Sequence, residues 1–216
     1  MTDLIPATAD PLVEALRQIE LPTLGHFLEE GFCDPRIRPI GDVGRMAGRA
    51  VTVDLTAPDA IAVNRALVRL QPGEVLVIRV HGGRHAPVGA VTAAAAIARG
   101  AAGIVVDGPV TDVSALTATA AALPVFATGT TALTTKRLGT AVEGVGRPTV
   151  VGGVPISEGD LVAGDENGVV AFGSDALRPE MLDAARRSDD EEPELLARIR
   201  RGDPLEDLLA LDTETL

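Results

Sequence analysis

The sequence predicts one α/β domain with a mixed sheet, followed by an acidic helical extension. Between residues 50 and 107, strand-like apolar runs alternate with helical patterns, which is typical of parallel strands joined by right-handed crossovers. After residue 125 short β-type segments take over, and from Ser174 the composition turns strongly acidic. The length, 216 residues, suits one domain with an extended end better than two large domains. We therefore expect a domain at 1–173 and an extension at 174–216.

Each expected element follows from its own pattern. Apolar residues at helical spacing predict helices at Pro11–Ile19, Leu21–Glu30, Ala57–Leu70, Val91–Arg99 and Val113–Ala122. Alternating or continuous apolar runs predict strands at Ala50–Leu55, Val75–Val80, Ile104–Asp107, Val125–Ala127, Ala141–Val145, Thr149–Val151, Leu161–Ala163 and Val169–Phe172. The segment Asp34–Gly48, with two prolines and three glycines, is typical of a surface connection. Asn167-Gly168 predicts a tight hairpin in which both residues have positive φ.

Composition excludes several classes of protein. The net charge is −12, and the chain has four Phe but no Trp or Tyr, so it lacks the basic face and the stacking rings that nucleic-acid binding uses. Its single cysteine, Cys33, cannot form an intramolecular disulfide. No apolar run approaches the ~18 residues of a membrane span, and the N-terminus lacks the pattern of a signal peptide. We expect a cytoplasmic protein that binds neither nucleic acid nor membrane.

The extension carries more than half of the net charge. It has 13 acidic and 6 basic residues, which leaves −7 there and −5 in the first 173 residues. The segment Pro193–Leu211 is amphipathic, and its pattern is broken at Gly202-Asp203-Pro204. Its apolar stripe consists of Leu195, Leu196, Ile199, Leu205, Leu208 and Leu209. Such a stripe needs a partner surface, which is either the chain's own domain or a neighbouring subunit, and the sequence favours neither.

Two features meet at one expected edge of the sheet. Gly89, Ala90, Val91 and Thr92 follow a strand and a loop and open a helix, so their amides form an anion site suited to a carboxylate. Asp112 follows the next strand, and the carboxyl ends of neighbouring parallel strands are where α/β sites form. Asp112 is suited to binding Mg²⁺ or to capping the helix Val113–Ala122, and its position favours the cap.

Several blocks of sequence, in order, carry a family resemblance. They are GRAVTVDLTAPDAIAVNRAL, LQPGEVLVIRV, GAVTAAAAIARGAAGIVVDGPVTD, LPVFATGTT and GDLVAGDENGVVAF. From about Thr23 to Phe172 the chain resembles the RraA-like family, which includes regulators of ribonuclease E activity and 4-hydroxy-4-methyl-2-oxoglutarate aldolases. Members are often misnamed demethylmenaquinone methyltransferases. The resemblance implies a swivelling β/β/α domain with mixed sheets that forms a homotrimer or hexamer, with the site at a subunit interface.

The resemblance implies an aldolase site that has lost several of its charged residues. In the family's aldolases an acidic residue after the helix-opening glycine helps to hold a metal-bound water, an arginine clamps the oxo-acid carboxylate, and the aspartate after it binds a divalent cation. The matching positions here are Gly89, Ala90, Thr111 and Asp112, and a further acidic position is Ala115. An arginine fork contributes about 1.5–3 kcal/mol per charged hydrogen bond. We expect oxo-acid cleavage to be badly impaired unless Arg84, Arg79 or a neighbour's side chain substitutes.

Three functional hypotheses follow. In the first, the scaffold is an enzyme with a more apolar pocket that cyclises or isomerises a carbonyl or enol compound, in secondary metabolism. Its catalytic candidates are Thr111 and Asp112, and its substrate-binding candidates are Gly89, Ala90, Val91, Thr92, Thr111 and Arg84. In the second, the protein is a lyase, an aldolase or oxaloacetate decarboxylase, with Mg²⁺ on Asp112. In the third, it is a non-catalytic regulator that binds an RNA-processing enzyme through its acidic surface.

Overall fold

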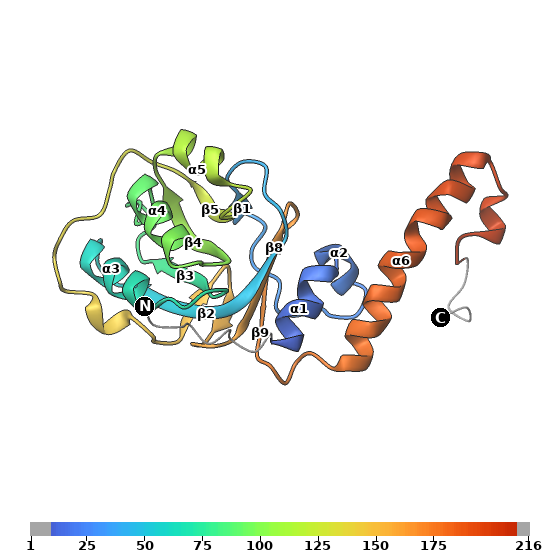
Figure 1. Ribbon diagram of the computed structural model, residues 1–216, viewed down its shortest axis with the longest axis horizontal. Coiled ribbons are helices and arrows are strands. Elements are labelled where there is room, and N and C mark those ends of the chain that lie inside the picture. Colours follow the sequence, from blue (N-terminus) through green and yellow to red (C-terminus); the bar gives the residue numbers. More distant parts are fainter. Residues whose placement is uncertain (1–9, 211–216) are drawn as a thin grey trace, which may run out of the picture.

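Seven strands form one mixed sheet in the computed structural model, which describes residues 10–210 (Figure 1). The strand order is β1-β5-β4-β3-β2-β8-β9, and a separate hairpin pairs β6 with β7. β2, β3, β4 and β5 are parallel to one another, whereas β1, β8 and β9 pair antiparallel with their neighbours. The two edge strands, β1 and β9, contact each other, so the sheet is nearly closed. The predicted α/β class with a mixed sheet is confirmed.

The elements alternate along the first two thirds of the chain. The strands are β1 (Arg38–Pro39), β2 (Met46–Leu55), β3 (Val75–Val80), β4 (Gly103–Val110), β5 (Val125–Thr130), β6 (Thr149–Val151), β7 (Val154–Ile156), β8 (Leu161–Asp165) and β9 (Gly168–Phe172). The helices are α1 (Pro11–Gln18), α2 (Leu21–Leu24), α3 (Ala60–Arg69), α4 (Ala90–Ala98), α5 (Val113–Thr119) and α6 (Pro179–Arg201). Short 3₁₀ helices are η1 (Val142–Gly144) and η2 (Leu205–Asp207).

Three apolar clusters hold the layers together. The first lies between α3, α4 and α5 and one face of the parallel strands, and includes Leu55, Ile78 and Ile104. The second fills the inside of the nearly closed sheet around the buried Phe126. The third packs α1, α2 and the first half of α6 on the outer face of β8 and β9. The helices therefore form two groups on separate parts of the sheet (Figure 1).

β2 is longer than expected because it has two sets of partners. Ala50 to Leu55 pair with β3, as the alternating pattern predicts, whereas Met46 to Arg49 pair with β8. The expected surface connection therefore ends before Met46, and it also contains β1. β7 was not expected either, because Pro155 lies at its centre. A two-stranded ribbon tolerates a proline where its nitrogen needs no acceptor.

The strand expected at Ala141–Val145 is wrong, because this segment forms η1. The carboxylate of Asp59 accepts a hydrogen bond from the amide of Ala141 at 3.0 Å and so anchors the start of the turn. Gly144 then packs on the backbone of Asp54, where an added Cβ would lie 2.1 Å from the carbonyl oxygen. Only a single bridge, Val53 to Val145, remains of the expected pairing.

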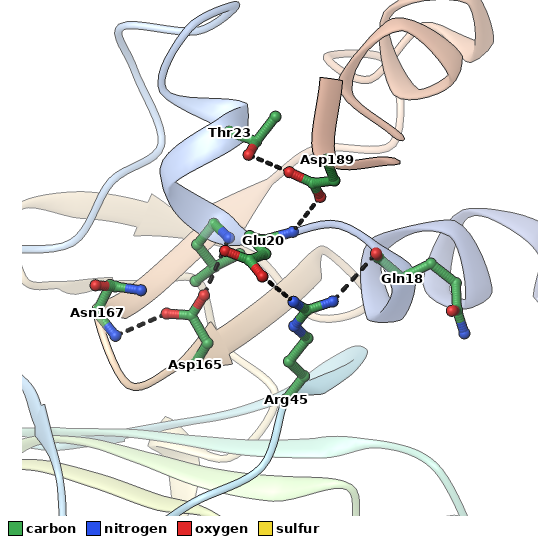
Figure 2. Close-up of polar contacts among 8 residues, drawn as sticks. Gln18, Glu20, Thr23, Arg45, Asp165, Asn167 and Asp189 are labelled. Atoms are coloured by element: carbon green, nitrogen blue, oxygen red, sulfur yellow. Dashed lines mark hydrogen bonds and ion pairs between the residues drawn. The ribbon is translucent and has the colours of Figure 1, made fainter. Parts of the chain in front are cut away.

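The hairpin between β8 and β9 is present, but its turn differs from the prediction. Gly168 has φ +150°, whereas Asn167 does not have positive φ. Instead, the buried Asp165 carboxylate accepts hydrogen bonds from the amides of Asn167 at 2.7 Å and Leu21 at 3.0 Å (Figure 2). One side chain therefore holds the turn and the start of α2.

In the described part of the acidic extension, α6 continues through Pro193 and leaves the body of the molecule, and the short η2 follows it (Figure 1). Leu182 and Ala185 are buried against the domain. Farther along, Asp189 accepts hydrogen bonds from the hydroxyl of Thr23 and from the amide of Glu20 (Figure 2). The helix ends at Gly202, at the predicted break. Leu211, the end of the predicted amphipathic segment, lies outside the described residues, as do residues 1–9 of the expected domain.

Among residues 10–210, no helix combines the length and the apolar character that crossing a membrane requires.

Candidate functional site

The candidate site lies where β3 and β4 end and α4 and α5 begin. The loop 81–89 connects β3 to α4, and Thr111 and Asp112 connect β4 to α5. β3 and β4 are adjacent and parallel, so both connections lie at the same edge of the sheet. This is the edge where ligands bind in open α/β sheets.

Asp112 caps α4 and not its own helix. Its Oδ2 accepts a hydrogen bond from the amide of Ala90 at 2.9 Å, and its side chain makes no capping bond to α5. The expectation that Asp112 caps the helix starting at Val113 is therefore wrong. Its backbone has φ 54° and ψ 43°, which makes it the single non-glycine residue of positive φ among residues 10–210. A left-handed conformation costs a non-glycine residue about 1–2 kcal/mol, and here it turns the carboxylate toward the neighbouring helix.

Gly89 is required at the start of α4 by the space available. An added Cβ would lie 2.5 Å from Asp112 Oδ2 and 2.8 Å from Thr111 Cγ2. The backbone angles of Gly89 are ordinary extended values, so the close approach alone demands glycine. The structure thus brings Gly89, Ala90, Thr111 and Asp112 into one cluster.

Backbone hydrogen bonds fix this cluster to the loop before α4. The amide of Thr111 donates to the carbonyl of Val88 at 2.9 Å, which ties the end of β4 to the loop. The hydroxyl of Thr92 turns back and donates to the carbonyl of Pro87 at 3.3 Å. Thr92 therefore offers its backbone amide to a ligand, while its side chain braces the loop.

Two apolar side chains next to the cluster are exposed. Val91, at the start of α4, is 84% exposed, and Val113, which follows Asp112, is 44% exposed. Sequence reasoning missed Val113, although its position directly after Asp112 at a helix start was a signal. Each of these exposed valines directly follows a residue of the cluster.

The two candidate arginines lie in different surroundings. Arg84, in the loop before α4, is exposed and makes no hydrogen bond or ion pair with any residue from 10 to 210, and its role in binding a substrate stays a prediction. Arg79 alternates along β3 with Ile78 and Val80, which face the helices, so it lies on the inner face of the sheet. There it is in register with Asp54 and Asp107 of the adjacent strands. Arg79 therefore lies among these carboxylates, and Arg84 stays the candidate on this chain for binding a substrate carboxylate.

Asp112 alone could hold a metal ion at this site. No group of three His, Cys, Asp or Glu side chains suited to a metal occurs in the described part of the chain. Mg²⁺ usually takes one or two carboxylates and several waters. Asp112 is exposed and its Oδ1 accepts no hydrogen bond from residues 10–210, so it could supply one such carboxylate.

Comparisons with known proteins agree on one family. The family model described as RraA-like, Aldolase/RraA, matches residues 12–171. A Halalkalibacterium halodurans protein named "Putative 4-hydroxy-4-methyl-2-oxoglutarate aldolase" is 36% identical over 137 residues, which are 63% of this chain and 63% of that protein. The chain thus matches less than two thirds of that relative's length.

Solved structures share the fold along most of the chain. An uncharacterized protein from Pseudomonas syringae superposes with a TM-score of 0.76 at 24% identity, covering 94% of this chain and 97% of that one. Streptomyces coelicolor RraAS2, described as an unusual member of the RNase ES inhibitor RraA family, has a TM-score of 0.71 at 25% identity and covers 89% and 98%.

Proposed function

Because this chain belongs to the RraA-like family, we propose that it is an enzyme in which the family's charged pocket has become one for a less polar carbonyl or enol compound. The reaction is isomerisation or cyclisation, and a role in secondary metabolism fits such chemistry. The observation that carries the proposal is the composition of the cluster. Asp112 is its single ionisable side chain, and Ala90 and Thr111 stand where the family's aldolases are expected to have an acid and an arginine.

The roles follow from the contacts. Asp112 accepts a proton from the carbon next to the substrate carbonyl and returns it at the end of the reaction. The amides of Val91 and Thr92, which have no acceptor among residues 10–210, bind the developing enolate oxygen at the positive end of α4. The side chain of Thr111, whose Cγ2 lies beside Gly89, contributes to the shape of the site and orients the substrate. Positioning of this kind contributes several kcal/mol to catalysis, on the order of 7–11 at its upper range.

Proton exchange is the direct test. The purified protein is incubated in D₂O with small β-dicarbonyl and enol compounds, and loss of the α-proton signal is followed by NMR. We expect exchange that falls at least about 100-fold in Asp112→Asn. Asp42→Asn is the matched control, because Asp42 is an exposed carboxylate in a loop. Exchange that is equal in both variants, or absent from all compounds, contradicts the proposal.

A second candidate is a Mg²⁺-dependent aldolase or oxaloacetate decarboxylase. It is favoured by the open Oδ1 of Asp112 and by the 36% identical relative named as an aldolase. Asp112 would hold the ion, which polarises the substrate carbonyl when bound. Turnover of oxaloacetate or pyruvate-derived aldols that a chelator and Asp112→Asn both abolish would establish this function in place of the first. A chain that turns over neither class but captures an RNA-processing enzyme would be a regulator.

A further inference from the structure

His81, the first residue after β3, is bonded to a carboxylate on the neighbouring strand. Its Nε2 lies 2.9 Å from Oδ1 of Asp54, which belongs to β2. The side chain of His81 is 40% exposed and that of Asp54 is 23% exposed. In the described part of the chain, His81 is the one histidine that pairs with an acidic side chain. The pair lies at the carboxyl ends of β2 and β3, the edge of the sheet that also holds the candidate site.

The carboxylate of Asp54 is held from a second side. The buried Thr149, on β6, donates its hydroxyl to the same Oδ1 at 2.9 Å. An ionised carboxylate only accepts hydrogen bonds, so the proton in the contact with His81 belongs to Nε2. The other ring nitrogen, Nδ1, makes no hydrogen bond with residues 10–210. A carboxylate that fixes one ring nitrogen and leaves the other open orients a histidine for proton transfer.

One loop connects this pair to the candidate site. The loop leaves β3 at His81, and its far end returns to the sheet at Val88, whose carbonyl accepts the amide of Thr111 at 2.9 Å. Thr111 precedes Asp112, and β3 and β4 are adjacent and parallel. His81 and Asp112 therefore follow the ends of two neighbouring strands. Neighbouring strands lie about 4.8 Å apart, so one small molecule can span both strand ends.

We propose that His81 is a second catalytic residue of this site, that Asp54 is its positioning residue, and that the substrate is a β,γ-unsaturated carbonyl compound. This role rests on the isomerisation proposed above, whose substrate class it specifies. One carboxylate is enough to exchange the proton beside a carbonyl. A second group at the neighbouring strand end suits a reaction in which one proton leaves the α-carbon and another enters a different carbon.

The step balances in protons and electrons. Asp112 takes the proton of the α-carbon, and the electron pair of that C–H bond forms the new C=C bond of a dienolate. The electron pair of the original β,γ double bond then takes a proton at the γ-carbon from Nδ1 of the His81 imidazolium, and the conjugated carbonyl compound forms. His81 is left neutral with its proton on Nε2, and Asp112 is left protonated. Asp112 then loses a proton to water and His81 gains one from water, so the site returns to its first state.

Deuterium labelling at two carbons tests the role of His81. The full chain is incubated in D₂O with β,γ-cyclohexenone, and NMR follows α-proton exchange and deuterium at the γ-carbon of the conjugated product separately. His81→Gln should lower γ-labelling at least about 100-fold and change α-exchange less than about twofold. His85→Gln is the matched control and should change neither, because His85 lies in the same loop without a carboxylate partner among residues 10–210.

The results distinguish this role from the proposed function. If α-exchange depends on Asp112 but γ-labelling is absent, or is unchanged in His81→Gln, the role of His81 is overturned and the proposed function stands. If the original chain shows no α-exchange, the proposed function is overturned and the role of His81 falls with it.

The positioning role of Asp54 is tested separately. Asp54→Asn keeps an oxygen that accepts from Thr149 but loses the charge that stabilises the imidazolium. The kcat for γ-labelling should therefore fall at least about tenfold with KM unchanged. Nitrogen NMR of isotope-labelled protein should show the neutral His81 ring with its proton on Nε2 in the original chain and on either nitrogen in Asp54→Ala. A loss of stability that leaves both kcat and the tautomer unchanged overturns this role.

Discussion

The carboxylate of Asp112 accepts a hydrogen bond from the amide of Ala90, so the residue that precedes α5 closes the start of α4. This bond joins two successive connections of the sheet, between residues 22 positions apart in the sequence. It also places the single carboxylate of the cluster against the N-terminus of α4.

Two substitutions of Asp112 should separate the contribution of its charge to stability from that of its left-handed backbone conformation. Asparagine tolerates the left-handed conformation, so Asp112→Asn should lower the free energy of unfolding by less than about 1 kcal/mol. Asp112→Ala loses both the cap and this tolerance, and should cost about 1–3 kcal/mol. Urea denaturation of both variants checks the order. Equal losses would show that the Ala90 bond does not depend on the backbone of Asp112.

Gly89→Ala should damage the site, because the new Cβ would lie 2.5 Å from Asp112 Oδ2. We expect a loss of about 1–3 kcal/mol in unfolding free energy and a loss of proton-exchange activity. Gly44→Ala is the matched control, since no atom lies within 4 Å of its added Cβ. Full activity in Gly89→Ala would mean that Asp112 can move without consequence.

Asp59 should make stability depend on pH in acid. Burial alone would raise the pKa of Asp59, but hydrogen bonds from the amides of Ala141, Gly139, Ile61 and Leu138 outweigh it and lower the pKa from 3.8 to about 2. The folded pKa lies below the unfolded one, so the carboxylate stabilises the fold above about pH 4 and this contribution is lost as the pH falls toward 2.

The variant Asp59→Asn isolates this effect. It should lower the unfolding free energy by about 1–3 kcal/mol near neutral pH, and the difference from the original chain should shrink as the pH falls through the same range. Denaturation curves at several pH values measure it, with Asp42→Asn as the exposed control. If the difference in unfolding free energy between the two chains does not change with pH, the loss comes from packing and not from the ionised carboxylate.

Asp189 should stabilise the packing of α6 on the rest of the domain. Asp189→Ala removes the acceptor of the Glu20 amide and of the buried Thr23 hydroxyl, and should cost about 1–2 kcal/mol. Faster hydrogen exchange along α6 should accompany this loss. Asp190→Ala makes the same change of charge at an exposed neighbour and should leave the exchange unchanged. Equal exchange in the two variants would show that apolar packing alone fixes the helix.

Restoring the charged groups should restore affinity for oxo acids. The double variant Ala90→Glu, Thr111→Arg should bind pyruvate at least about tenfold more tightly than the original chain, because a guanidinium fork binds a carboxylate through two charged hydrogen bonds. Thr111→Lys supplies the charge without the fork, and should gain less. Calorimetry compares the three chains. Equally tight binding by the original chain would contradict an apolar pocket.

The sequence predicted the parallel core because its signals are local. Ala50–Leu55 alternates, Val75–Val80 is a short continuous apolar run, and the segment after Gly89 is rich in the strong helix former alanine, so each element is recognisable from its own residues. The segment at Ala141 escaped prediction, because its conformation depends on the carboxylate of Asp59, far away in the sequence. Tertiary contacts of this kind override β propensity.

The position of the candidate site was predictable for the same reason, but its inner geometry was not. Strand order alone places Gly89 and Asp112 at one edge of the sheet. The carboxylate of Asp112 reaches α4 only because its φ is 54°, an angle that an aspartate in a sequence does not reveal. The position of Arg79 on the inner face did follow from simple alternation with Ile78, although the sequence-based hypothesis did not use it.

Because β2 pairs with β3 and with β8, it also determines the order in which the sheet can form during synthesis. Ala50 pairs with Val75, which emerges soon after it, whereas Met46 pairs with Gly164, which emerges much later. Closing the shorter loop costs less chain entropy, so the parallel unit can form while the first residues of β2 still present an open edge. A ribosome-bound chain stopped before β8 would therefore expose that edge, and this is the stage at which the protein is most vulnerable to pairing with another nascent chain.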